Sequence, residues 1–230
     1  MPAAMAPDIS NAAASPETFA AWSRGWAITR QVAPPIAHGD GLRIEVGLPT
    51  QLVRYVFPHP SAWLRELGQT ITQPWIFLKA CAEADQLRSL LPAHWEIQPD
   101  AFMMTCSDAP FAGKGALATG YSLQVTDEVV RARQAHVVVH ADDGSLAASG
   151  HLALDERLAI YDRIVTAPEH QRRGLGRVVM HVLQTLAHRH GRHGGVLVAT
   201  EQGRRLYETL GWVVHAPWAS AVIPGAAQAG

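Results

Sequence analysis

The residues with the clearest chemical potential lie in the stretch 169–177, which reads EHQRRGLGR. Two glycines stand one residue apart behind two arginines, so bare backbone and positive charge are concentrated in a few positions. Glycine lets the main chain approach an anion closely, and the first N–H groups of a helix carry a partial positive charge. A loop of this composition in front of a helix predicts an anion site, with phosphate as its usual guest.

Two common nucleotide-binding loops do not fit this stretch. The pattern GxxxxGK[ST] of ATP- and GTP-binding loops does not occur in the sequence. The dinucleotide-binding pattern needs a third glycine and an acidic residue about 20 residues further on. The run GLGRVV has no third glycine, and no suitable acid follows the next predicted strand. A phosphate ligand of another kind is therefore indicated.

The elements that must position this loop alternate between strand and helix patterns. AIYDRIVT before the loop has the composition of a strand, and apolar residues recur at helical spacing in GLGRVVMHVLQTLAHRHG after it. GGVLVAT then predicts a strand inside a sheet, EQGRRLYETLG a short helix, and WVVHA and WASAVIP a pair of closing strands. Upstream, Asp143-Gly144 between two β-rich runs predicts a hairpin. The order predicts a mixed α/β sheet.

Two motifs in this region give the chain a resemblance to a known family. Gln171-Arg172-Arg173-Gly174-Leu175-Gly176 matches the Q/R-x-x-G-x-G/A signature of the GNAT superfamily of N-acetyltransferases. LYETLGW, with a tyrosine four residues before a glycine–aromatic pair, is similar to the family's second signature. The resemblance covers about residues 130–215. It implies an α/β (α+β) fold in which helices flank a mixed, mostly antiparallel central sheet.

The resemblance also implies a donor site for acetyl-CoA. In the family, the strand before the loop splays from the next central strand, so the backbone of Ile164, Val165 and Thr166 lines the pantetheine arm. Where the family often carries an asparagine that contacts the cofactor, this sequence has Thr200, with Gln202 as an alternative. The pyrophosphate is cradled by the loop, to which we assign Gln171, Arg172, Arg173, Gly174, Leu175, Gly176 and Arg177.

Two residues are candidates for catalysis. Tyr207 matches the general acid that protonates the leaving CoA thiolate, with packing of its helix as the alternative. Asp162, on the strand that leads to the loop, is the candidate base, with a salt bridge to Arg163 or Arg157 as the alternative. Weaker candidates for proton transfer are Glu156, Glu201, His136 and His151.

The N-terminal half offers less chemistry. Residues 1–17 are rich in Ala and Pro and predict a disordered tail. Residues 18–60 read as β-like, beginning with GWAITR, and residues 61–70 and 74–91 read as two helices. We expect residues 18–95 to form an N-terminal extension or appended module and residues 96–230 to form the core. The alternative is one enlarged core that begins near residue 50.

The apolar and aromatic residues of this half are candidates for lining an acceptor pocket, and ordinary core packing is the alternative. These residues are Trp63, Trp75, Trp95, Phe102, Met103 and Met104.

Composition narrows the function classes. A net charge of −1 gives no reason to expect nucleic acid or an anionic membrane as a partner. Two cysteines cannot form a disulfide framework, and the twelve histidines show no spacing typical of a metal site. No stretch approaches the roughly 18 apolar residues of a membrane-spanning helix. We therefore expect a cytoplasmic protein without metal, and a homodimer is left open.

The function implied by the resemblance is acetyl-CoA-dependent N-acetylation of a primary amine on a small-molecule or amino-acid-like acceptor, by direct transfer. A non-catalytic acyl-CoA-binding or regulatory module on the same fold is the alternative.

Overall fold

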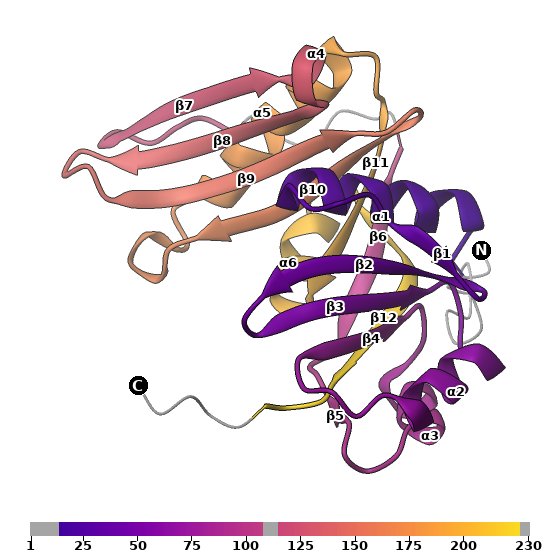
Figure 1. Cartoon of the computed structure of the whole chain (residues 1–230). Coiled ribbons are helices and arrows are strands. Elements are labelled where there is room, and N and C mark those ends of the chain that lie inside the picture. The colour runs from indigo at the N-terminus through magenta and orange to yellow at the C-terminus, as the bar shows by residue number, and fades with distance from the viewer. Residues whose placement is uncertain (1–13, 108–114, 226–230) are drawn as a thin grey trace, which may run out of the picture. The chain divides into compact units, whose positions relative to one another are not determined.

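The computed structural model describes residues 14–107 and 115–225 (Figure 1). Backbone contacts group the chain into two compact units that interleave along the sequence. Of the described residues, unit 1 comprises 14–16, 35–103 and 214–225, and unit 2 comprises 17–34, 104–107 and 115–213. The sequence predicts a linear division between residues 95 and 96 instead, and independent folding of residues 18–95 stays a prediction.

Unit 1 is a sheet with two short helices. Its strands lie in the order β1-β2-β3-β4-β12, and β5 also pairs with β12. Strand β3 is antiparallel to β2 but parallel to β4, and helix α2 connects this parallel pair. Leu64, Leu78, Leu87 and Trp95 form the fully buried centre of its core. The elements are β1 (Ile36–His38), β2 (Gly41–Leu48), β3 (Gln51–Phe57), α2 (Ala62–Thr70), β4 (Ile76–Ala80), α3 (Ala84–Leu90), β5 (Glu96–Ile97) and β12 (Val213–Val222).

Unit 2 contains the predicted signatures. Its strands lie in the order β6-β11-β10-β9-β8-β7. Strands β7 to β10 are antiparallel, and β10 and β11 form a parallel pair. The elements are α1 (Pro16–Arg30), β6 (Ala101–Cys106), β7 (Tyr121–Glu128), α4 (Val129–Ala132), β8 (Gln134–Ala141), β9 (Leu146–Leu154), β10 (Leu158–Thr166), the 3-10 turn η2 (Pro168–His170), α5 (Leu175–Arg189), β11 (Gly194–Thr200) and α6 (Glu201–Glu208).

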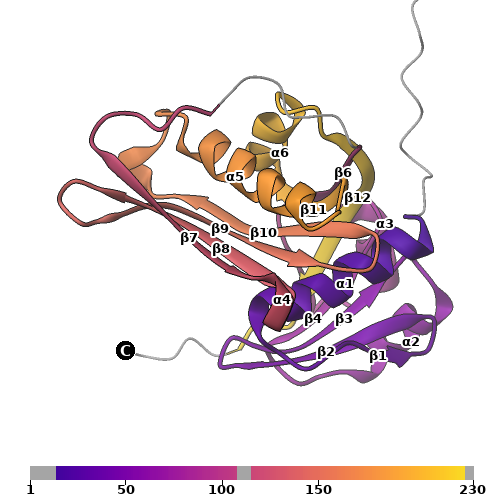
Figure 2. The ribbon, with the colours of Figure 1, turned by 90° about the horizontal axis from the view of Figure 1, so that it is seen from above.

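Two helices cover opposite faces of the sheet in unit 2 (Figure 2). On one face, α5 lies so close to β9 that a Cβ on Gly150 would be 2.5 Å from Val179. On the other face, a Cβ on Gly25 of α1 would be 2.4 Å from Ile160 of β10. The predicted fold class, a mixed and mostly antiparallel sheet flanked by helices, is confirmed.

The predicted strand at GWAITR is wrong, because these residues end helix α1. Within α1 the buried side chains of Phe19, Trp22, Trp26 and Thr29 recur every three or four residues. A window of six residues hides this period, and its aromatic and β-branched members then suggest a strand. The predicted tail 1–17 falls largely outside the described residues, and Pro16 and Glu17 already belong to α1.

The predicted helix 74–91 is wrong in its first half. Residues 76–80 form β4, in which Ile76, Leu78 and Ala80 are buried and the residues between them are not. A short apolar run is ambiguous between helix and strand, and here pairing with β3 decides.

The predicted pair of closing strands is a single strand, β12. Pro217 suggests a break in the sequence because proline has no N–H for a sheet ladder. The register with β4 begins at Ala219, beyond the proline.

Candidate active site

The predicted anion loop lies at the start of α5. Gly174 is the N-cap residue, with φ of 78° and no side-chain cap on the helix. A side chain at this left-handed φ would be strained, although a Cβ there would meet nothing within 4 Å. Val178 N donates to Gly174 O at 3.1 Å, which leaves the earlier N–H groups of the turn outside the helical pattern. The space in front of these donors suits an anion.

The side chains around this loop anchor it from outside. Arg173 Nη1 donates to the Tyr121 hydroxyl at 2.8 Å, and Arg177 Nη2 donates to Thr209 Oγ1 at 2.9 Å. Leu175 is only 1% exposed, so its contribution to a ligand is limited to its main-chain N–H. Gln171 Nε2 donates to Thr166 O at 3.4 Å. These contacts favour the backbone as the anion cradle.

The two glycines of the loop, Gly174 and Gly176, are required for different structural reasons. Gly174 permits the backbone turn, whereas a Cβ on Gly176 would be 3.1 Å from Leu206 Cδ2 of α6. Gly176 therefore lets the first turn of α5 pack closely against α6.

The expected splay between the two central strands is present. The parallel register of β10 and β11 runs from Leu158↔Gly194 to Ile160↔Val196. Beyond this point β10 has an irregularity against β9 between Asp162 and Val165, and Arg163 has a φ of 50°. A cavity of about 170 Å³ lies where the register ends, and its lining includes Asp162, Ile164, Val198, Thr200, Gly203 and Tyr207. We call this cavity, with its lining residues, the donor gap.

The predicted donor-binding residues do not all line the donor gap. Ile164 lines it, whereas Val165, which is 56% exposed, and Thr166 are not in its wall. Thr200 lines it too, but its hydroxyl also caps α6 by accepting from Gly203 N at 3.2 Å. The remaining O–H of Thr200 can still donate to a ligand.

Tyr207 stands in the wall of the donor gap and is 7% exposed. Its ring lies 6.1 Å from that of Trp212, which packs edge-on against Tyr161 at 5.1 Å. Burial raises the pKa of the Tyr207 phenol, and the negative charge of Asp162 adds to the effect. The group therefore stays protonated at neutral pH and faces the gap as an O–H donor.

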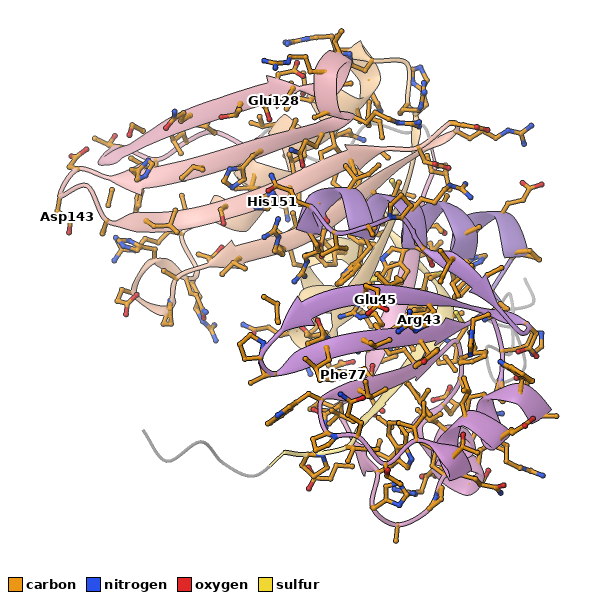
Figure 3. All side chains as sticks on the ribbon, viewed as in Figure 1. Arg43, Glu45, Phe77, Glu128, Asp143 and His151 are labelled. Atoms are coloured by element: carbon orange, nitrogen blue, oxygen red, sulfur yellow. The ribbon has the colours of Figure 1, made fainter. Side chains whose placement is uncertain are left out.

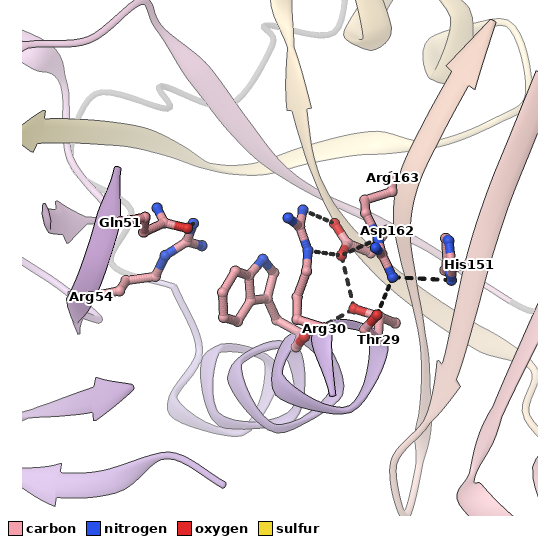
Figure 4. Close-up of polar contacts among 8 residues, drawn as sticks. Thr29, Arg30, Gln51, Arg54, His151, Asp162 and Arg163 are labelled. Atoms are coloured by element: carbon pink, nitrogen blue, oxygen red, sulfur yellow. Dashed lines mark hydrogen bonds and ion pairs between the residues drawn. The ribbon is translucent and has the colours of Figure 1, made fainter. Parts of the chain in front are cut away.

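Asp162 is held in an ion pair and has little basicity to offer (Figure 4). Its carboxylate accepts from Arg30 Nε at 2.8 Å, from Arg30 Nη2 at 3.3 Å and from the Thr29 hydroxyl at 2.8 Å. Burial by itself would raise the pKa of this carboxyl, but Arg30 and Thr29 outweigh it and hold the pKa below its ordinary value. These contacts favour a structural role, and the role as base stays a prediction.

Three of the six residues predicted to line an acceptor pocket are core residues, and for Trp63, Trp75 and Phe102 the role stays a prediction. Trp95, Met103 and Met104 are at most 1% exposed, so core packing, the alternative, describes them. The sequence does not indicate Arg163 as a site residue, and it makes His136 and His151 only weak candidates. Alternation along β8 and β9 places both histidines on one face, and that was the available signal.

The described parts of the chain hold no group of three or more His, Cys, Asp or Glu residues that could bind a metal. They also contain no helix long and apolar enough to cross a membrane.

Residues 110–220 match the family model described as the acetyltransferase (GNAT) domain. This chain carries a GNAT acetyltransferase domain. The matched span of the GNAT domain includes the uncapped start of α5, the splayed strands and Tyr207. Acyl-CoA-dependent acetyl transfer is the general activity of this family. No curated protein matches the sequence.

Several solved structures share the fold at low sequence identity. A GCN5-related N-acetyltransferase from Kribbella flavida has a TM-score of 0.61 and 14% identity, with 89% of this chain and 95% of that chain covered. A putative GNAT acetyltransferase from Novosphingobium aromaticivorans has a TM-score of 0.55 and 18% identity, with 92% and 99% covered. A tandem GNAT protein from the clavulanic acid biosynthesis pathway has a TM-score of 0.54 and 16% identity, with 83% and 82% covered.

Proposed function

We propose that this protein is an acetyl-CoA-dependent N-acetyltransferase that acetylates a primary amine of a small or amino-acid-like molecule by direct transfer. The observation that supports this most is the continuity of the donor site in unit 2. The uncapped start of α5 behind Gly174 offers N–H groups to a pyrophosphate, and the gap between β10 and β11 offers unpaired strand backbone to an amide-containing arm. The inner wall of the same gap holds Tyr207.

The proposed reaction follows from these positions. A neutral amine attacks the thioester carbonyl, the C–N bond forms and the C–S bond breaks. The sulfur leaves as a thiolate and takes the proton of the Tyr207 phenol. The proton that the nitrogen loses then restores the phenol, directly or through water. Because the raised pKa of Tyr207 makes it a reluctant donor, the proton moves as negative charge develops on the sulfur.

The setting of the reaction is part of the proposal. Both cysteines, Cys81 and Cys106, are free, which suits a reducing compartment such as the cytoplasm. We propose no nucleic acid, membrane or metal in the reaction.

Two measurements on the purified protein test this function. Acetyl-CoA at 100 times its Kd should stabilise the folded state by about 2.7 kcal/mol, visible as a higher Tm. A panel of primary amines should then release free CoA thiol in the presence of the enzyme. If acetyl-CoA does not stabilise the protein, the proposed donor site is wrong. Stabilisation without turnover of any amine would favour the alternative, a non-catalytic acyl-CoA-binding module.

A further inference from the structure

A second cavity of unit 2 shares Arg163 with the donor gap. Its volume is about 160 Å³. It is lined mostly by polar side chains, among them Thr29, Glu128, Gln134, His136, His151 and Arg163. Figure 3 shows two of them in place, with Glu128 near the end of β7 and His151 on β9. The proposed reaction assigns no role to this cavity.

Two residues that line this cavity, His136 and His151, belong to a row of side chains across neighbouring strands. The register pairs His136 of β8 with His151 of β9, and His151 with Asp162 of β10, so these side chains share one face of the sheet. The two imidazoles stack with centroids 4.0 Å apart and planes 17° apart. The end of α1 lies over the same face, because Thr29 and Arg30 both bond to Asp162.

Arg163 connects this row to α1. Its Nη2 donates to the carbonyl oxygen of Thr29 and, at 3.2 Å, to Nδ1 of His151 (Figure 4). A guanidinium can only donate, so Nδ1 of His151 is the unprotonated nitrogen of a neutral ring. Both hydrogen bonds leave from Nη2, and Nε lies 3.9 Å from Asp162 Oδ2, so the other terminal nitrogen, Nη1, is the donor that a ligand would engage.

The charges next to Arg163 do not balance. Asp162 pairs closely with Arg30 at 2.8 Å and only distantly with Arg163 at 3.9 Å, so two guanidinium groups share one carboxylate. The imidazoles are uncharged at neutral pH, because burial and the nearby Arg163 lower the pKa of His136 and bring that of His151 to about 4. Glu128 is an exposed lining residue. Arg163 is thus the cation in the lining that an anion would complement, because its nearest carboxylate, Asp162, is already held closely by Arg30.

We infer that this cavity receives the acceptor, and that the acceptor is an amino acid or a close analogue whose carboxylate is held by Arg163. This inference rests on the proposed function. Arg163 lines both cavities, so a carboxylate on its guanidinium places the neighbouring amine beside the donor gap. A left-handed φ of 50° at a residue with a side chain is costly, and such strain is often found at functional sites.

The size of the cavity agrees with this class of acceptor. An engineered protein cavity of about 150 Å³ holds benzene, which has six heavy atoms. The amine, the α-carbon, the carboxylate and the first side-chain carbon of an amino acid make up the same number. Glu128 at the mouth disfavours a second acidic group, so neutral or basic amino acids should be preferred over Asp and Glu.

The test compares matched acceptors. We would measure kcat/KM by CoA thiol release for the proteinogenic L-amino acids and for amines that lack only the carboxylate, such as L-leucine with isopentylamine and L-phenylalanine with phenethylamine. In the wild type, at least one amino acid should be acetylated. In Arg163→Gln the acid-to-amine ratio of kcat/KM should fall at least about tenfold, as expected for a lost charge-assisted hydrogen bond. Differences in amine reactivity cancel, because each ratio is compared between two enzymes.

Two further variants protect this test against a misfolded Arg163→Gln. His136 lines the acceptor cavity but not the donor gap, so His136→Gln should raise KM for the amino acid and leave kcat and the Kd of acetyl-CoA unchanged. Arg157→Gln is the matched control, since its side chain is 84% exposed and lines neither cavity. It should change none of these constants.

The outcomes separate the two proposals. Acetylation only of amines without a carboxylate overturns the acceptor assignment, and so does acetylation of no member of the panel while acetyl-CoA still binds. An unchanged acid-to-amine ratio in a folded Arg163→Gln also overturns it. If the wild type fails to bind acetyl-CoA, the proposed function falls and the acceptor assignment falls with it.

Discussion

Two strand–helix–strand connections in this molecule have the same order of elements but differ at the start of the helix. In unit 1, α2 joins the parallel strands β3 and β4, and in unit 2, α5 joins the parallel strands β10 and β11. In each case an antiparallel strand, β2 or β9, comes directly before the first strand of the parallel pair. A second helix, α3 or α6, follows the second strand of the pair. The same order of elements therefore occurs twice, although the sequence shows no repeat.

The difference lies in the first residues of the two helices. Ser61 has extended backbone and its hydroxyl accepts from Leu64 N at 3.1 Å, so α2 is capped by its own chain. Gly174 offers α5 no side-chain cap. The Ser61 hydroxyl accepts a hydrogen bond from a first-turn N–H of α2, whereas the first-turn N–H groups of α5 after Gly174 are left for a ligand. A strand–helix–strand connection is therefore not an anion site by itself, and the cap residue decides.

The largest expected effect comes from placing a carboxylate at the open helix start. Gly174→Glu should weaken acetyl-CoA binding at least about 100-fold, because it costs two or more charge-assisted hydrogen bonds to the pyrophosphate. Isothermal titration calorimetry measures the Kd. His59→Glu, in the exposed loop before α2, is the matched control and should bind normally. Binding of Gly174→Glu within threefold of the wild type would place the pyrophosphate elsewhere.

The next largest effect concerns the phenol of unit 2. Tyr207→Phe should lower kcat about 100-fold through loss of the proton donor, with the Kd of acetyl-CoA unchanged. Steady-state kinetics measures kcat, and calorimetry on the same preparation measures the Kd of acetyl-CoA. Tyr55→Phe removes a phenol of unit 1 that accepts from Arg43 at 3.2 Å, and should keep full turnover. Equal turnover in Tyr207→Phe and the wild type would leave Tyr207 a packing residue only.

Most elements of both units could be predicted from the sequence, and the main exceptions are α1 in unit 2 and β4 and the undivided β12 in unit 1. The loop at Gly174, the turn at Asp143-Gly144 and the amphipathic helix after Leu175 carry their signals within a few adjacent residues. Strand β4 has no such signal, since residues 76–80 fit either element until β3 lies beside them.

The acceptor cavity was beyond the sequence for a related reason. His136, His151 and Arg163 lie on three strands, and only the register brings them into one row. The role of Arg30 depends on α1, whose residues 25–30 have the sequence pattern of a strand. Residues that meet through pairing across a sheet leave no local pattern, whereas a helix start does.

A third prediction contrasts an ion pair in each unit. Asp162→Asn should lower the free energy of unfolding by about 2 kcal/mol, because the side chain is 15% exposed and Arg30 would lose its counter-charge. The pair Arg43–Glu45 has Glu45 52% exposed, so Glu45→Gln should cost at most about 0.5 kcal/mol. Urea unfolding measures both, and equal losses would contradict the contrast.

The pH dependence of that difference follows from the pKa of Asp162. The folded-state pKa lies below the ordinary value of 3.8, so the carboxylate stabilises the fold fully above that value. The contribution is lost as pH falls through the lowered folded pKa. The difference in free energy of unfolding between the wild type and Asp162→Asn should therefore be constant at neutral pH and disappear only in strong acid. A difference that disappears near pH 6 would point to a different titrating group.

The smallest effects separate two caps that look alike. Ser61→Ala and Thr200→Ala each remove a hydroxyl that accepts from a helix N–H, at 3.1 Å and 3.2 Å, so each should cost about 1 kcal/mol of stability. Only Thr200 lines the donor gap, so only Thr200→Ala should also weaken acetyl-CoA binding, by about threefold to tenfold. Denaturant unfolding gives the stability of both variants, and calorimetry gives their Kd for acetyl-CoA. If both variants bind acetyl-CoA like the wild type, Thr200 acts only as a cap, and the expected substitute for the family's asparagine must be sought at Gln202.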